Sequence, residues 1–221
     1  MDDLILSQDG SHTVMSKKFG VSYHSKYGAV QETQTVFIDA GLKHLETSGK
    51  RHISILEMGF GTGLNAIMTL LKALPTSHIN YHTVEAYPIS RIQYQQLNFP
   101  GVLELSQSQE NAFIQMHESP SAETQELASN FTFTKHLMKI EDFQTADKFD
   151  VVYYDAFAPT SQEELWTQAM MEKMYAMCND GAVLVTYCAK GSFKRALKGA
   201  GFTVEALDGP IGKREMTRAH K

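Results

Sequence analysis

Residues 53–65 read Ile-Ser-Ile-Leu-Glu-Met-Gly-Phe-Gly-Thr-Gly-Leu-Asn and carry the pattern on which the fold prediction rests. An apolar, β-branched run ends at Glu57, and Gly59, Gly61 and Gly63 follow before a helix-like segment begins. Because glycine has no Cβ, such a turn lets the backbone approach a small ligand beside a helix N-terminus. The stretch therefore predicts a strand, a tight turn and a helix that together hold a small molecule.

A second strand-like run, residues 79–85, ends in another carboxylate, Glu85, 22 residues beyond Gly63. Nucleotide-binding α/β folds place an acidic residue at this spacing to bind ribose hydroxyls. The glycine pattern differs from the G-x-G-x-x-G of diphosphate cofactors, and a carboxylate at Glu57 would repel a pyrophosphate. A ribose-bearing ligand with a positively charged end fits better, and S-adenosylmethionine (SAM) has both an ammonium and a sulfonium group.

The composition predicts one domain with a full hydrophobic core and one small appendage, since 43% of the 221 residues are hydrophobic. The longest apolar windows are shorter than the roughly 20 residues of a membrane span, and the N-terminus lacks a signal-like apolar core. We expect a cytoplasmic protein without a membrane partner. Cys178 and Cys188 are the only cysteines, too few for a disulfide framework or a thiolate zinc site, and both are expected to be reduced.

The net charge of −5 argues against a generally basic nucleic-acid binder, but the charge is unevenly distributed. Residues 190–221 contain eight Lys and Arg against three acidic residues, so this segment carries about +5 and the remainder about −10. Two interpretations stay open for the basic segment, a local site for a polyanion and an ordinary solvated charged face.

Alternating strand-like and helix-like segments predict an α/β, Rossmann-like fold, with a mainly parallel twisted sheet covered by helices on both faces. The expected strands are 53–57, 80–85, 132–137, 150–154, 182–187 and 202–206, and the expected helices are 63–74, 88–97, 108–117, 163–177 and 190–199. Residues 1–35 contain two hairpin-like pieces, 13–19 and 21–23, and are expected to form a flap over the domain of residues 36–221. The apolar end of residues 31–38 looks like the entry into a helix, and the polar segment 117–130 is expected to be a loop or a short helix.

In a doubly wound sheet, ligands bind outside the carboxyl ends of the strands. Besides Glu57 and Glu85, two such ends carry carboxylates, Glu141-Asp142 and Asp155 in Asp-Ala-Phe-Ala-Pro. Asp155 could orient an incoming amine and accept its proton, or it could merely cap the turn that follows. Capping is also the alternative for Glu57 and Glu85.

Aromatic residues also lie at or beside strand ends and in the flap. Phe157, Tyr154 and Tyr187 could stack on a nucleobase, or could simply pack in the core. In the flap, Tyr23, His24 and Ser25 could close over the cofactor or form an ordinary surface hairpin. His78 and His82 lie four apart on a strand without a third ligand, so no metal site is expected. The sequence has no G-x-S-x-G or Walker-type motif, which leaves serine hydrolysis and ATP-driven chemistry without support.

Several motifs, taken together and in order, resemble the MnmC/MnmD methyltransferase family over nearly the whole chain. They are Tyr23-His-Ser with Glu32-Thr33, the loop Glu57 to Asn65, Asp155-Ala-Phe-Ala-Pro159 with Trp166, Gly191 to Phe202, and Gly212-Lys-Arg-Glu-Met216. The resemblance implies SAM-dependent methylation of the aminomethyl group of 5-aminomethyl-2-thiouridine at the wobble position of tRNA.

By the same resemblance, Asp155 is the expected catalytic carboxylate, and Asp142 is expected to face the adenine of SAM. The expected cofactor-binding residues are Tyr23, Ser25, Glu57, Gly59, Gly61, Thr62, Gly63, Asn65, Glu85, Ala86, Asp142 and Asp155. The expected substrate-binding residues are Phe157, Tyr187, Lys194, Arg195, Lys213 and Arg214, of which the four basic ones would bind anticodon-stem phosphates.

Two features depart from the family pattern. Members usually show D-G-F-A-P, whereas this chain has Ala156, whose extra methyl group narrows the acceptor pocket. Many members also carry a FAD-dependent oxidase that makes the aminomethyl substrate, whereas this chain stops soon after Lys-Arg-Glu-Met, so we expect methyl transfer alone and a separate enzyme that supplies the substrate. The alternatives are a SAM-fold enzyme that acts on a small amine, as polyamine synthases do, and a non-catalytic SAM-fold module that binds RNA or a protein.

Overall fold

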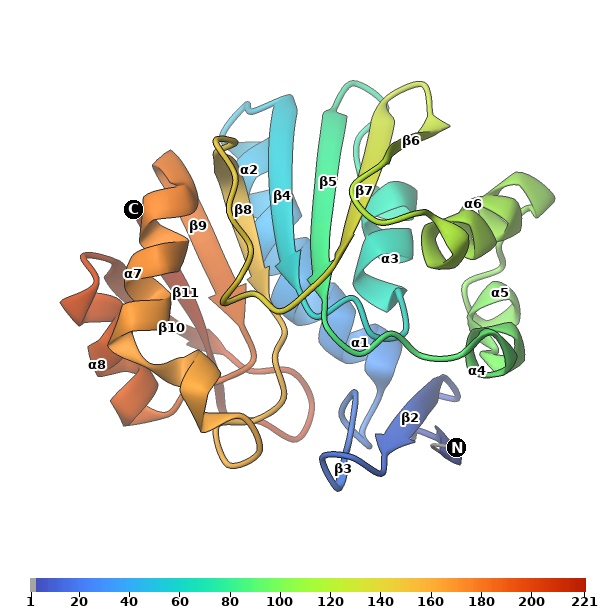
Figure 1. Cartoon of the computed structure of the whole chain (residues 1–221), viewed down its shortest axis with the longest axis horizontal. Coiled ribbons are helices and arrows are strands. Elements are labelled where there is room, and N and C mark those ends of the chain that lie inside the picture. Colours follow the sequence, from blue (N-terminus) through green and yellow to red (C-terminus); the bar gives the residue numbers. More distant parts are fainter. Residues whose placement is uncertain (1–2) are drawn as a thin grey trace.

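The computed structural model describes residues 3–221 and contains an eight-stranded sheet in the order β10-β11-β9-β8-β4-β5-β7-β6 (Figure 1). Its strands are β4 (His52–Met58), β5 (His78–Glu85), β6 (Thr124–Ala128), β7 (Phe131–Leu137), β8 (Phe149–Tyr154), β9 (Cys178–Thr186), β10 (Thr203–Asp208) and β11 (Glu215–His220). The five central strands, β9-β8-β4-β5-β7, run parallel. The predicted α/β class with a mainly parallel sheet is confirmed.

Both edges of the sheet are antiparallel, and there the sequence-based assignment was incomplete. The segment predicted as a loop or short helix contains strand β6, which pairs with β7. Strand β11 was not predicted, although it lies between β9 and β10 and pairs with both. The β6 prediction was wrong because an edge strand exposes polar side chains that resemble those of a loop.

Helices cover both faces because buried side chains alternate along the strands. In β8, Val151 and Tyr153 belong to the core on one face, whereas Val152 and Tyr154 belong to the core on the other. Helices α3 (Leu64–Lys72), α4 (Arg91–Gln96), α5 (Phe99–Val102) and α6 (Gln107–Glu118) contribute to the first core. The second core contains side chains of η2 (Glu163–Trp166), α7 (Gln168–Met177) and α8 (Gly191–Gly199).

One helical segment runs from α1 (Ala29–Thr33) through the π-helical η1 (Gln34–Lys43) into α2 (His44–Thr47). It covers the first face of the sheet near β8 and β9 and packs against α3. A Cβ on Gly41 would lie 2.9 Å from the ring of Tyr153, so the glycine permits the close approach. The helix whose entry was expected at the apolar end of residues 31–38 exists but begins earlier, at Ala29, and the expected boundary between residues 35 and 36 falls inside it.

The N-terminal segment forms a small antiparallel sheet of β1 (Asp3–Leu6), β2 (His12–Ser16) and β3 (Val21–Ser22). Figure 1 shows β2 and β3 beyond the carboxyl ends of the parallel strands, where the expected flap would lie. The hairpin-like pieces correspond to β2 and β3, whereas β1 was not predicted. Among residues 3–221, no helix has both the length and the apolar content needed to cross a membrane.

Candidate functional site

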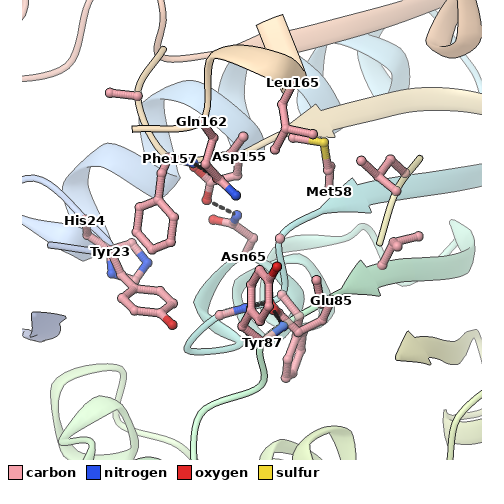
Figure 2. A pocket seen from close by; sticks show the side chains of 18 of the residues that line it. Tyr23, His24, Met58, Asn65, Glu85, Tyr87, Asp155, Phe157, Gln162 and Leu165 are labelled. Carbon is pink, nitrogen blue, oxygen red and sulfur yellow. Dashed lines mark hydrogen bonds between the residues drawn. The ribbon is translucent and has the colours of Figure 1, made fainter. Parts of the chain in front are cut away.

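A cavity of about 370 Å³ lies at the carboxyl ends of β4, β5 and β8 and extends under the flap (Figure 2). The chain runs outward from β4 through β5 to β7, then returns to the other side of β4 with β8. This reversal is the topological switch point at which open α/β sheets bind ligands. The volume lies within the range of small-molecule pockets.

The glycine turn forms the floor of the cavity, and none of its three glycines has room for a side chain. Gly59 has a φ of +90°, and a Cβ there would lie 2.7 Å from the carbonyl oxygen of Asp155. Gly61 has a φ of +51°, and its Cβ would lie 2.8 Å from the ring of Tyr23. Both glycines line the cavity, whereas Gly63 begins helix α3 and is not among the lining residues.

Glu85 holds the turn in place from the end of β5. One carboxylate oxygen accepts a hydrogen bond from the backbone N–H of Gly61 at 2.8 Å, and the other accepts one from Tyr87 N–H at 2.5 Å. Burial raises the pKa of this carboxyl, although these backbone donors oppose the shift. Glu85 lines the cavity with Ala86, so its remaining lone pairs can accept hydrogen bonds from ligand hydroxyls.

Glu57 lies outside the cavity lining, contrary to the direct ligand contact expected for it. Its position in β4 turns the side chain toward α3, where it is fully buried. Its carboxyl oxygens and the hydroxyls of Tyr81 and Thr83 have no hydrogen-bond partner within residues 3–221. Burial raises the pKa of Glu57 well above its usual value and so favours the protonated form of this group beneath the turn.

Asp155 stands at the end of β8 and faces the cavity. Asn65 Nδ2 donates a hydrogen bond of 2.8 Å to Asp155 Oδ2 (Figure 2), and Thr33 Oγ1 donates one of 2.9 Å to Asn65 Oδ1. Burial, with a smaller contribution from the negative charge of Glu32, raises the pKa of Asp155 to about 7. The carboxylate is thus held in one orientation and can exchange a proton near neutral pH.

A second wall of the cavity brings together residues from both ends of the chain. Lys213 Nζ lies 2.5 Å from Glu32 Oε1 and 3.8 Å from the ring centroid of Tyr187. The hydroxyl of Tyr187 donates a hydrogen bond of 2.7 Å to the carbonyl of Ala156. Glu32 belongs to one of the family motifs but was not expected to lie in the site. The sequence signal that could have indicated it is an acidic residue seven positions after Ser25, whose N–H binds Glu32 Oε2.

The flap reaches the cavity through aromatic rings. Phe157 contacts Phe19 at a centroid distance of 4.7 Å and Tyr23 at 4.9 Å, and Phe19 also lies 5.8 Å from Tyr87. Tyr23, Ser25, Thr62 and Phe157 all line the cavity. The rings of Phe19 and Tyr23 in the flap therefore pack against Phe157 at the cavity, a contact that was not predicted.

Several expected residues are not brought to the cavity. Asp142 is exposed and outside the lining, which contains its neighbour Glu141 instead. Lys194 forms an ion pair of 2.9 Å with Glu215, and neither Lys194, Arg195 nor Arg214 lines the cavity. Tyr154 is buried in the core, and His78 stacks on His52. Within residues 3–221, no group of three or more His, Cys, Asp or Glu side chains could hold a metal ion.

Sequence comparison gives one family match and a set of similar proteins. The model of a family described as S-adenosyl-L-methionine-dependent methyltransferase matches residues 103–221. The chain is 29% identical over 225 residues to the tRNA 5-methylaminomethyl-2-thiouridine biosynthesis bifunctional protein MnmC of Burkholderia thailandensis, covering 96% of this chain and 34% of that protein. A protein of the same name from Aromatoleum aromaticum is 29% identical over 226 residues, covering 97% and 34%. The chain spans about a third of the length of these relatives.

Solved structures share the fold. MnmC2 from Aquifex aeolicus superposes with a TM-score of 0.78 at 24% identity, over 100% of this chain and 70% of that one. The magnesium protoporphyrin IX methyltransferase ChlM from Synechocystis, crystallised with S-adenosylhomocysteine, gives a TM-score of 0.53 at 13% identity, over 87% of this chain and 85% of that one.

Proposed function

Because the chain belongs to the S-adenosyl-L-methionine-dependent methyltransferase family, we propose that it methylates the aminomethyl nitrogen of 5-aminomethyl-2-thiouridine at the wobble position of tRNA. Family membership gives the donor and the reaction type. The acceptor is the further step, and it rests on the names of the relatives and on the chemistry of the cavity.

The residues around the cavity fit SAM as the methyl donor. The turn at Gly59 and Gly61 leaves bare backbone that a side chain would block, and Glu85 presents a carboxylate where ribose hydroxyls are bound in related folds. We assign these three residues, with Thr62 and Ala86, to the donor. SAM, when bound, supplies a methyl group on a positively charged sulfur.

Asp155 is the observation that carries the assignment of an amine acceptor. Methylation of an amine forms a nitrogen–carbon bond, breaks a sulfur–carbon bond and releases one proton from the nitrogen. A carboxylate with a pKa of about 7, held by Asn65 at the cavity wall, can orient the nitrogen and accept that proton. A hydroxyl group is a weaker acid than a protonated amine and would need a stronger base than Asp155, whereas Asp155 can accept a proton from an amine.

Two further features support a tRNA acceptor. The relatives are named for tRNA 5-methylaminomethyl-2-thiouridine biosynthesis, and residues 190–221 carry a net positive charge that suits a phosphate backbone. The aminomethyl group is itself the product of earlier chemistry, so we expect another enzyme activity to supply the substrate. Arg195 and Arg214 are candidates for phosphate contacts.

The test is transfer of a labelled methyl group from SAM to tRNA isolated from cells that make the aminomethyl group and cannot methylate it. We expect label in the RNA fraction and methylaminomethyl-2-thiouridine in the digested nucleosides. Label in a small-molecule amine added in parallel, with none in RNA, would select the small-amine alternative that the acidic cavity also suits. SAM binding without transfer to either acceptor would indicate a non-catalytic module.

A further inference from the structure

The Lys213 side chain places an ammonium group inside the cavity, close to Asp155. We propose that Glu32 and the ring face of Tyr187 form an ammonium-binding subsite, which Lys213 occupies in the free protein and which the ammonium of a bound ligand takes over. The inference rests on the proposed function for the identity of the expected ligand, an acceptor with a primary amine.

The subsite is built from side chains that are fixed by other contacts. Glu32 is 5% exposed, and its Oε2 accepts a hydrogen bond of 2.8 Å from Ser25 N–H, which leaves Oε1 directed to Lys213. Tyr187 is anchored by its hydroxyl on the carbonyl of Ala156. A buried carboxylate beside an aromatic face is an arrangement that recognises ammonium groups, because charge attraction and the ring quadrupole act together.

Lys213, which occupies the subsite in the free protein, is held less firmly than Glu32 and Tyr187, which form it. The Lys213 side chain is 31% exposed and comes from the turn between β10 and β11. That turn is held independently, since Ile211 N–H donates to Gln31 Oε1 at 3.2 Å and Gly212 packs against Tyr27 without room for a Cβ. Lys213 can therefore leave by rotation of its own side chain.

Electrostatics favour replacement of Lys213 by another cation over an empty subsite. Glu32 and Asp155 both line the cavity, and the charge of Glu32 acts on Asp155. His24 lies near Glu32 and Lys213, but burial lowers its pKa to about 4, so it is neutral at physiological pH. If Lys213 left without replacement, two carboxyl groups would face each other with less compensation.

Two ligands carry a suitable ammonium, the acceptor's aminomethyl group and the α-ammonium of SAM. We expect the acceptor, because the subsite lies beside the carboxylate assigned to take its proton. Glu32 would then bind the protonated amine, and Asp155 would receive the proton before methyl transfer.

The experiment measures binding selectivity between two anticodon stem-loop RNAs, one with 5-aminomethyl-2-thiouridine and one with 2-thiouridine, in the presence of S-adenosylhomocysteine. Both RNAs have the same phosphate backbone, so the contribution of phosphate contacts cancels in the ratio of the two dissociation constants. Lys213→Met should raise the preference for the aminomethyl RNA about 3- to 10-fold, because the competitor is gone. Glu32→Gln should lower it about tenfold. SAM affinity, measured by calorimetry, should stay within about twofold for both variants.

Lys50→Met is the matched control, because Lys50 Nζ also lies 2.5 Å from a buried carboxylate, Asp150, but at the amino end of the sheet. It should change neither the ratio nor SAM affinity. Thermal unfolding checks that Glu32→Gln is folded, and Lys213→Met, on a partly exposed side chain, tests the subsite independently.

The outcomes distinguish the ammonium of SAM from that of the acceptor, and failure of the subsite from failure of the proposed acceptor. Opposite changes in SAM affinity, with an unchanged RNA ratio, would assign the subsite to the ammonium of SAM. The subsite would be overturned if Lys213→Met and Glu32→Gln changed the RNA binding ratio or SAM affinity in the same direction, or if they changed neither quantity. If the wild-type protein neither methylates nor prefers the aminomethyl RNA, the proposed acceptor fails, and the SAM measurement still decides whether the subsite exists.

Discussion

The two walls of the cavity are assembled in different ways. The donor wall, formed by Gly59, Gly61 and Glu85, comes from one β-loop-α unit and the end of the next strand, and backbone groups fix it. The acceptor wall, formed by Glu32, Asp155, Tyr187 and Lys213, draws on the flap side, two strand ends and the β10–β11 turn. The donor wall is therefore set by local chain geometry, whereas the acceptor wall depends on side chains that tertiary contacts bring together.

The walls also differ in their electrostatics. Backbone N–H groups bind both oxygens of Glu85, whereas the side chain of Asn65 binds Asp155 and the side chain of Lys213 binds one oxygen of Glu32, whose other oxygen accepts from Ser25 N–H. Side-chain partners can be changed by mutation or by a ligand, and backbone donors cannot. Mutations in the acceptor wall should therefore change rate and pH dependence, and mutations in the donor wall should change SAM affinity or folding.

The largest expected effect is on turnover and comes from the acceptor wall. Asp155→Asn keeps the shape of the side chain and removes the base, so methyl transfer should fall by about 10²–10⁴-fold. SAM affinity should remain within a few-fold, because the proposed role of Asp155 is toward the amine. Single-turnover methylation and calorimetry measure the two quantities, and a loss confined to SAM binding would move Asp155 to the donor wall.

In the donor wall, Gly59→Ala should destabilise the protein by about 2–5 kcal/mol, since it adds both a left-handed non-glycine residue and a contact with backbone. Gly49→Ala is the control, because Gly49 has a φ of +92° but nothing within 4 Å of its Cβ position. That variant should lose only about 1–2 kcal/mol, the conformational cost alone. Urea unfolding compares the two, and equal losses would show that the close approach at Gly59 is not required.

The pH dependence of turnover should report the pKa of Asp155. The base works when ionised, so the rate should fall about tenfold for each pH unit below about 7 and level off above it. The hydrogen bond from Asn65 lowers the pKa of Asp155, so Asn65→Ala should move the acid limb to higher pH. If the acid limb of the pH–rate profile did not move in Asn65→Ala, Asn65 would not be a hydrogen-bond partner of the proton-accepting group.

Glu57 should affect stability and its pH dependence instead of binding. Its pKa is raised in the folded protein, so above the unfolded value near 4.5 the unfolded chain releases a proton that the folded chain keeps. Glu57 therefore costs stability increasingly as the pH rises, and Glu57→Gln should gain relative to wild type between pH 5 and pH 8. Chemical unfolding at both values measures this gain.

Glu46 provides a control of opposite sign. Lys43, Ser77 and the N–H of Leu74 bind its carboxylate, and although burial opposes the shift, these partners lower the pKa of Glu46. Glu46 thus stabilises the fold above the unfolded pKa, and this contribution is lost in acid. Glu46→Gln should lose more stability at pH 8 than at acidic pH, and the same trend in both variants would contradict the raised pKa of Glu57.

The smallest effect separates two neighbouring acidic residues at the end of β7. Glu141 lines the cavity and Asp142 does not, so Glu141→Gln should weaken SAM binding a few-fold and Asp142→Asn should leave it unchanged. Calorimetry with each variant checks this. The reverse result would restore Asp142 to the position beside the adenine.

Local sequence patterns were sufficient for most of the sheet and for the donor wall. Few backbone conformations are compatible with a strand that runs into Gly59 and Gly61. The predicted helix 190–199 also matches α8, Gly191–Gly199. The prediction failed for β6 and β11, because the pairing of an edge strand depends on a distant partner. Strand alternation from Ile53 and Ile55 could have placed Glu57 on the core face, outside the cavity lining.

The sequence by itself determined the α/β architecture, the glycine turn and the carboxylates at the strand ends, because these follow from periodicity and backbone sterics within short segments. Only the tertiary structure decided that Glu32 meets Lys213, 181 residues away, that burial raises the pKa of Glu57, and that Asp155 has a pKa of about 7. Burial and the distances between charges set these properties, and both depend on how remote segments pack together.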